Sequence, residues 1–332
     1  IKYNQVGAAT SDVTNFQAAW SDCAGLTSFP LIDTSSVSRF TVTWNGCSGL
    51  TAFPVLDFSN ATDVDFAWQN CSGLTSFPQI DTSSVTNFGG AWALCSGLTT
   101  FPILDTSSGT NFSTAWKAIG VTTFPSLDFS SGTTFAGGWR ESTSLTTYPA
   151  NRFDSTGTLV STAFNNAWFR CALTAQSIEN ILTSLDTNGA QNITLGIQDG
   201  TNANASTWSY DALTAYIKLH NKGWTISKNG DATDISYKIT IASNGDSFTL
   251  RSLGTVNYDV DWGDGNSETS TSNTLPHTYT TAGTYVIKVN YNSGTYRPNF
   301  NNSGDEDQIT STSIGTGDSA VMGTNLRGSF KG

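Results

Sequence analysis

Hydrophobic and polar positions recur along the first half of the chain with a period of 24 residues. Tryptophans mark this period most clearly, at spacings of 24, 24, 24, 24 and 23. A Phe-Pro pair, replaced by Tyr148-Pro149 in the last copy, follows each tryptophan after eight or nine residues, and Asp follows the first five pairs. A regular period of this length predicts one supersecondary unit that is repeated along the chain.

A 24-residue unit buries too little apolar surface to fold alone, so we expect the copies to stack around one continuous core. The proline of each pair lacks an N–H donor and therefore ends or borders a strand. The D-T-S-S stretch after it favours a turn, because an Asp side chain accepts hydrogen bonds from N–H groups a few residues later. Residues 1–173 are thus predicted to form a repeat solenoid in a mainly β chain.

The segment DTSSVTNFGGAWALCSGLTTFP, residues 81–102, resembles the unit of BspA-like leucine-rich repeat surface proteins. The usual unit has DTS-x-VT-x-M followed by MF-x-x-C-x-x-L. Here Phe stands for the first Met, and Ala-Trp stands for Met-Phe. The resemblance covers about residues 9–173. It implies a leucine-rich-like solenoid that is exposed outside the cell or on a virion, is often adhesive, and has no catalytic activity.

Beyond residue 173 the pattern changes to helical and strand-like segments. Ile178, Ile181, Leu182 and Leu185 have helical spacing, and Gly189 can end that helix. NITLGI at 192–197 predicts a strand, residues 206–223 a second helix, and WTISKNG at 224–230 a strand and a turn. Residues 174–230 are therefore predicted to be an α/β cap that shields the end of the solenoid core.

From about Ser236 apolar and polar residues alternate, which predicts a small antiparallel β-sandwich over residues 231–292. YDVDWGDGNSE and HTYTTAGTYVIKV resemble a PKD domain, the immunoglobulin-like module of many surface proteins, over roughly 236–290. The resemblance implies that Trp262 packs between the sheets, that Asp264-Gly265 forms a tight turn, and that His277 braces a turn. A metal-ligand or base role is the alternative for His277.

Residues 293–332 are predicted to be a linker and the start of a second repeat array. Phe330 and Leu326 fit the Trp and Phe positions of the unit. On this basis we expect the chain to be a segment of a longer protein with alternating modules.

Five cysteines each follow a repeat tryptophan by three residues: Cys23, Cys47, Cys71, Cys95 and Cys171. Ile119 and Ser142 take this place in the two other repeats. A position that accepts Ile is small, buried and apolar, where free Cys is common. A disulfide would need specific Cβ directions, and an odd count leaves one cysteine over. We therefore predict a ladder of inert thiols, and no zinc site, because no C-x-x-C pair occurs.

The tryptophan ladder has two interpretations, a core ladder or an exposed platform for sugar rings. Its members are Trp20, Trp44, Trp68, Trp92, Trp116 and Trp139. The core interpretation is favoured, because the resembling family places Phe there.

The aspartate ladder also has two interpretations. Its members are Asp33, Asp57, Asp81, Asp105 and Asp128. They either cap their own turns or bind Ca²⁺, which takes several oxygen ligands at once. Capping is favoured, but like charges stacked every ~5 Å repel one another unless they are hydrogen-bonded or solvated, which keeps calcium open. We expect no cofactor and no metal, with calcium kept as the alternative.

Motifs of catalysis are missing from the sequence. There is no P-loop, dinucleotide-binding glycine motif, H-E-x-x-H or G-x-S-x-G. The two histidines, His220 and His277, fall in different modules, which disfavours a His-based triad. Asp259, Asp261 and Asp264 cluster within a turn motif. Asp63 and Asp65 break the repeat, and we predict that they lie on a solvated face. A glycosidase carboxylate pair stays open, but the prediction is that the protein is not an enzyme.

The net charge disfavours two classes of binding partner. With 15 Lys and Arg against 26 Asp and Glu, the chain carries a net charge of −11, which disfavours nucleic acid and anionic membrane surfaces. No run approaches the ~20 apolar residues of a membrane span, so no membrane insertion is expected.

We predict an extracellular-surface or virion protein with a structural and adhesive role. Five free thiols suit folding in a reducing cytoplasm, which favours a segment of a phage tail fibre or similar appendage that binds a host cell. The expected partners are a cell-surface glycan or protein receptor and other copies or segments of the fibre. A bacterial adhesin, or a purely structural spacer, is the alternative.

Overall fold

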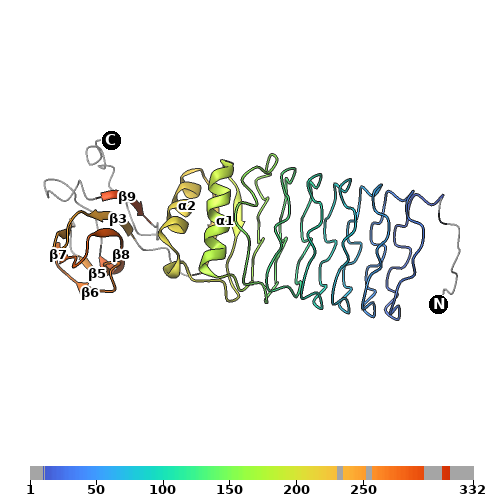
Figure 1. The fold of residues 1–332 in the computed structure, drawn as a ribbon, viewed down its shortest axis with the longest axis horizontal. Coiled ribbons are helices and arrows are strands. Elements are labelled where there is room, and N and C mark those ends of the chain that lie inside the picture. The colour runs from blue at the N-terminus through green and yellow to red at the C-terminus, as the bar shows by residue number, and fades with distance from the viewer. Residues whose placement is uncertain (1–9, 11, 230–234, 252–255, 295–308, 315–332) are drawn as a thin grey trace. The chain divides into compact units, whose positions relative to one another are not determined.

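A computed structural model describes residues 10, 12–229, 235–251, 256–294 and 309–314 (Figure 1). The chain divides into two compact units. The first comprises residues 1–207 and 218–229, and the second residues 208–217 and 230–332. Helix α2 (Tyr210–Asn221) contributes to both.

Each 24-residue repeat lies directly against the next, as the successive turns in blue and green show (Figure 1). Single-residue parallel bridges join equivalent positions, such as Arg39 to Asp63 and Asp63 to Asn87. Four backbone bonds of 2.8 Å run from the second repeat to the third: the N–H groups of residues 40, 42, 44 and 46 donate to the carbonyls of residues 63, 65, 67 and 69. Elsewhere in the repeat the direction reverses, since Thr62 N donates to Ser38 O at 2.9 Å.

The predicted fold class, a mainly β leucine-rich-like solenoid with a cap and a sandwich, is wrong. The described repeats contain no strand, only turns and isolated bridges, and the regular strands beyond residue 193 form one small parallel sheet and two antiparallel sheets. The reason is local. Alternate N–H groups donate back to the carbonyl three residues earlier, as Ala67 N does to Val64 O. Two residues per repeat are left-handed, for example Phe66 (φ 54°) and Asn70 (φ 61°), which interrupts any extended run.

A short α/β segment follows the last repeat. It comprises α1 (Ala175–Asn188), β1 (Thr194–Gly196), the 3-10 turn η1 (Ala205–Thr207), α2 and β2 (Thr225–Ser227). Thr174 caps α1 by accepting a hydrogen bond from Ser177 N, and α1 ends at Gly189 with φ 80°. Ser177 Oγ accepts from Tyr148 N at 3.0 Å, which ties α1 to the last Tyr-Pro pair. β1 pairs in parallel with β2, and Leu195 of β1 also bridges to Phe164, so β1 continues the backbone ladder of the repeats.

The second unit contains two antiparallel sheets. One has the order β6-β5-β8-β3-β9 and the other pairs β4 with β7. Their bounds are β3 (Ile235–Ile241), β4 (Ser247–Arg251), β5 (Val256–Asp261), β6 (Ser267–Ser270), β7 (Thr274–Thr278), β8 (Gly283–Gly294) and β9 (Ile309–Ile314). A shared core includes Phe248, Tyr258, Trp262 and Ile287. β9, in the segment expected to be a linker, pairs with β3. Leu326 and Phe330 lie outside the described residues.

His277 braces the turn that follows β5. Its Nε2 lies 2.8 Å from Asp264 Oδ2, and its ring stacks on Trp262 at 4.5 Å. Burial raises the pKa of Asp264, but the hydrogen bonds from His277 and Asn266 together outweigh it and hold this pKa below its usual value. These contacts agree with the structural role predicted for His277.

Candidate functional site

The tryptophan ladder lies inside the repeat stack. Trp44, Trp68, Trp92, Trp116 and Trp139 are fully buried, as is Trp168, and only Trp20 in the first repeat is half-buried. Neighbouring indole rings lie 4.9–6.0 Å apart with planes within 13° of parallel. Buried rings cannot meet a sugar, so the described ladder is a core feature and not a platform.

The indole N–H groups of the six buried tryptophans have no hydrogen-bond acceptor. In five of these repeats the ring of the following Phe-Pro or Tyr-Pro pair lies edge-to-face with the indole. The centroids are 4.7–5.1 Å apart and the planes are tilted by 75–84°. An aromatic face is a weak acceptor for N–H. This packing offers the row of indoles a partner other than a polar ligand.

The cysteine ladder supplies hydrogen-bond donors to the core. Sγ of Cys47, Cys71, Cys95 and Cys171 donates to the carbonyl of the tryptophan one repeat earlier, at 3.0–3.1 Å. Ser142, which replaces Cys, makes the same bond to Trp116 O at 3.0 Å. Burial, and next the neighbouring thiol, raises the pKa of Cys47 to about 11 and of Cys71 to about 12. Both thiols therefore stay protonated and can donate.

The aspartate ladder caps turns. The backbone N–H two residues later donates to each Oδ1 at 2.8–3.0 Å, in the order Ser35, Ser59, Ser83, Ser107 and Ser130. All five carboxylates are exposed. Hydrogen bonds from the side chain and backbone of Ser83 lower the pKa of Asp81. Among the described residues, no three His, Cys, Asp or Glu side chains are placed to hold one metal ion.

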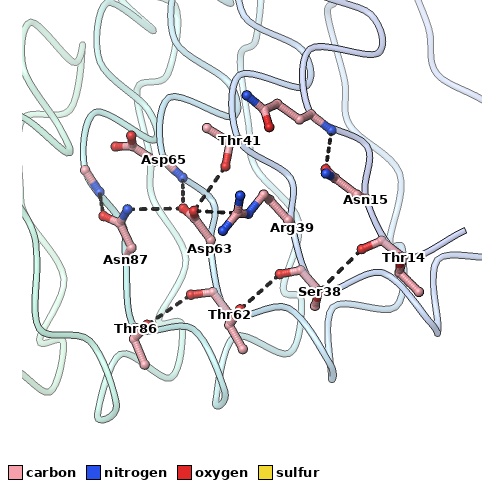
Figure 2. Close-up of polar contacts among 12 residues, drawn as sticks. Thr14, Asn15, Ser38, Arg39, Thr41, Thr62, Asp63, Asp65, Thr86 and Asn87 are labelled. Atoms are coloured by element: carbon pink, nitrogen blue, oxygen red, sulfur yellow. Dashed lines mark hydrogen bonds and ion pairs between the residues drawn. The ribbon is translucent and has the colours of Figure 1, made fainter.

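A second ladder of polar side chains covers one face of the stack (Figure 2). We call the display face the column Asn15, Arg39, Asp63, Asn87 and Asn111 together with the column two residues on, Gln17, Thr41, Asp65, Gly89 and Ser113. Asn87 Nδ2 donates to Asp63 Oδ1 at 3.1 Å, and Asn111 Nδ2 donates to Asn87 Oδ1 at 2.9 Å. Oδ1 of the first-column Asn and Asp residues also accepts the N–H two residues later.

A row of hydroxyl groups runs beside the display face. Thr62, Thr86, Thr110 and Thr133 each donate through Oγ1 to the carbonyl of the equivalent residue one repeat earlier, at 3.0–3.2 Å. Figure 2 shows the bonds of Thr62 and Thr86. Thr62, Thr86 and Thr110 are exposed and Thr133 is half-buried, and the bonds hold the four side chains in one orientation. The row therefore presents the same group at every repeat.

Asp63 is the most connected member of the display face. Its carboxylate accepts from Asp65 N at 3.0 Å and Thr41 Oγ1 at 3.1 Å, and it lies 3.8 Å from Arg39 Nε (Figure 2). Its side chain is 22% exposed. Asp65 is half-buried too, and burial, followed by the charge of Asp63, raises its pKa to about 6. Both carboxylates thus lie at the surface, as predicted, but they are only partly exposed to solvent.

Two glycines of the fourth repeat accommodate Asp65 and Phe66 of the third. A Cβ on Gly89 would lie 2.5 Å from Asp65 Oδ1, and one on Gly90 would overlap the Phe66 ring. The side chains of Asp65 and Phe66 therefore occupy space that is left open because the next repeat has glycine at both positions. Phe66 stays half-buried and adopts φ 54°, an uncommon value for a bulky residue. Two carboxylates, a guanidinium and an amide thus meet on one surface, and Phe66 follows Asp65 in the chain.

Sequence reasoning missed Arg39, Thr41, Phe66 and Asn87 as neighbours of Asp63 and Asp65. The sequence feature that could have identified them is the variation of residue type between repeats at these positions. The core columns stay almost unchanged, whereas the first display column has Asn, Arg, Asp, Asn and Asn.

Comparisons with known proteins do not identify the function of this site. No protein-family model matches the chain, and neither curated proteins nor solved structures give a significant match. No helix in the described part of the chain is long and apolar enough to cross a membrane.

Proposed function

We propose that this chain is a non-enzymatic segment of an extracellular or virion appendage, such as a phage tail fibre, and that its display face binds a receptor on a host-cell surface. The observation that carries the proposal is that different side chains project from equivalent backbone positions. The residues joined by parallel bridges are Asn15, Arg39, Asp63, Asn87, Asn111 and Thr134. A constant core with a varied face is the arrangement of repeat proteins that bind through an extended surface.

The chemistry of the face favours a glycan over a protein receptor. Sugar hydroxyls both donate and accept hydrogen bonds, and the carboxylates, amide and guanidinium around Asp63 supply both kinds of partner. Phe66 adds an aromatic surface beside them. The resemblances to BspA-like repeats and to a PKD domain support an exposed location, and the free thiols support assembly in a reducing cytoplasm before release on a virion.

A glycan array and host-cell binding, both with the fluorescently labelled full chain, test the proposal. The variant Asp65→Ser/Phe66→Thr copies Ser113-Thr114 of the fifth repeat, so the backbone tolerates it. We expect at least tenfold weaker binding. The control Asn70→Ala changes an exposed residue of the same repeat that is outside the two display columns. Asn70 and Ala118 occupy equivalent left-handed positions. Unchanged binding of the first variant would show that the face is not the site. Absence of all binding would favour the structural spacer.

A further inference from the structure

One side of the repeat stack carries no charged residue over five consecutive repeats. We call it the uncharged side. It comprises residues 23–32, 47–56, 71–80, 95–104 and 119–127, which contain no Asp, Glu, Lys, Arg or His. The whole chain has a net charge of −11. Charge is therefore concentrated elsewhere, and this side has a different surface chemistry from the display face.

An exposed apolar row runs along the uncharged side. Leu31, Val55 and Ile103 are 76%, 63% and 65% exposed, and they occupy the same position of the repeat, directly after the proline. The Phe rings two residues before this position stack at 5.7–6.2 Å from repeat to repeat, so members of the row lie in neighbouring layers. Val160 is the one other large hydrophobic residue that is strongly exposed in the described part of the chain.

Folding does not require apolar residues at this position. Gln79 and Ser126 occupy the same column in other repeats and are exposed. Gln79 donates through Nε2 to the carbonyl of Ile103 at 2.5 Å, so a polar side chain fits without changing the backbone. Exposure of aliphatic side chains to water is energetically unfavourable, and aligned rows of them mark interaction surfaces.

We propose that the uncharged side docks against the same side of a second copy of this chain. Two acidic chains repel each other, and this side lets them approach without opposing ionised side chains directly. The row, which Gln79 interrupts between Val55 and Ile103, is also matched by an equal row, since a two-fold interface pairs one surface with itself. The proposal does not depend on the proposed receptor binding, because it concerns another side of the stack.

The aspartate ladder bears on how two copies fit together. Asp33, Asp57 and Asp105 follow the members of the apolar row two residues later and are exposed. A two-fold axis parallel to the stack places the two aspartate columns at opposite edges of the contact. A perpendicular axis would bring them together, and like charges would then repel. The copies are therefore expected to lie parallel.

Three aliphatic side chains and their prolines cover less than the ~800 Å² per partner of a standard interface, so the dimer should be weak. We expect a dissociation constant of about 10–1,000 µM.

Sedimentation velocity of the full chain from low to high micromolar concentration tests the proposal. The variant Leu31→Gln/Val55→Gln/Ile103→Gln extends the natural Gln79 column without altering the charge. The control, Ser36→Gln/Asn60→Gln/Ser84→Gln, places the same residue at three exposed positions that are 24 residues apart, outside the apolar row. We expect the wild type and the control to dimerise with rising concentration. The first variant should remain monomeric, with at least a tenfold weaker association and an unchanged melting temperature.

A wild type that stays monomeric at 1 mM, on the order of the weakest expected constant, would overturn the proposal. The apolar row would then bind a partner other than a second copy of this chain. Equal dimerisation of the wild type and both variants would also overturn it, because the contact would then lie elsewhere. Loss of dimerisation in both variants would show that glutamine itself, and not the apolar row, controls the association.

Discussion

Replacement of Cys95 by Ser and by Ala distinguishes a donor role of the cysteine ladder from an apolar one. Cys95 is fully buried, and its Sγ donates to Trp68 O at 3.0 Å. Trp68 O also accepts the N–H of Cys71, so the thiol is its second donor. Ser142 Oγ already makes the equivalent bond to Trp116 O at 3.0 Å in a serine-containing repeat.

The two substitutions should differ in free energy of unfolding. Alanine removes the hydrogen bond and leaves a void of about one sulfur atom, which together destabilise the protein by about 2 kcal/mol. Serine keeps a donor at the same place, and we expect less than about 1 kcal/mol. In an apolar pocket the order would reverse, because a buried hydroxyl without a partner costs about 1–3 kcal/mol.

Urea unfolding, followed by tryptophan fluorescence, measures the difference. Equal denaturant slopes would show that the midpoints report stability. We expect the midpoints to fall in the order wild type, Cys95→Ser, Cys95→Ala. A Cys95→Ala protein that is more stable than Cys95→Ser would refute the donor role.

Four further outcomes are expected. The raised pKa of Asp65, about 6, means that the folded state binds its proton more tightly than the unfolded state, so its contribution to stability is lost as pH rises from about 4 to 6. Asp65→Asn should therefore stabilise the protein at pH 7.5 and have little effect at pH 3.5 in matched urea titrations. Gly73→Ala should destabilise by about 1–3 kcal/mol, because its Cβ would lie 2.5 Å from Ser48 O. Gly25→Ala, at the same position of the first repeat, meets nothing within 4 Å and should leave the melting temperature unchanged. Thiol titration should count one fast-reacting group in the native protein, the exposed Cys23, and five after denaturation without reductant. EDTA should not change the melting temperature, and a fall of ~10 °C or more would contradict turn capping by the aspartate ladder.

The 24-residue period was sufficient to predict which side chains lie inside the repeats. Tryptophan, leucine and phenylalanine recur together, and burial of these columns follows from the need for a continuous core. The turn role of the aspartates followed from the Ser two residues later. Backbone conformation was not predictable in the same way. Val42 has φ 60°, a value that a β-branched residue rarely adopts, so residue preference pointed away from the turns that tertiary packing imposes.

The donor role of the cysteines had a signal that was misinterpreted. Ile119 suggested an apolar pocket, whereas Ser142 indicated a hydrogen-bonding one, and both substitutions are accommodated. The display face was less accessible to sequence reasoning. Asp65 and Gly89 are 24 residues apart, and their complementarity appears only when neighbouring repeats are superposed as layers.

The hydrogen bonds between neighbouring repeats have a mechanical consequence for the stack. Each repeat touches its neighbours alone, so a pulling force along the stack loads the boundaries one after another in series. Between the repeats of Trp92 and Trp116, Ile119 takes the Cys position, so this boundary lacks the side-chain bond that Cys or Ser makes to the tryptophan of the preceding repeat. Opening one boundary frees a 24-residue unit, which extends by up to about 80 Å of contour length. Under sudden tension such a stack lengthens in steps and dissipates the load before the whole structure is lost.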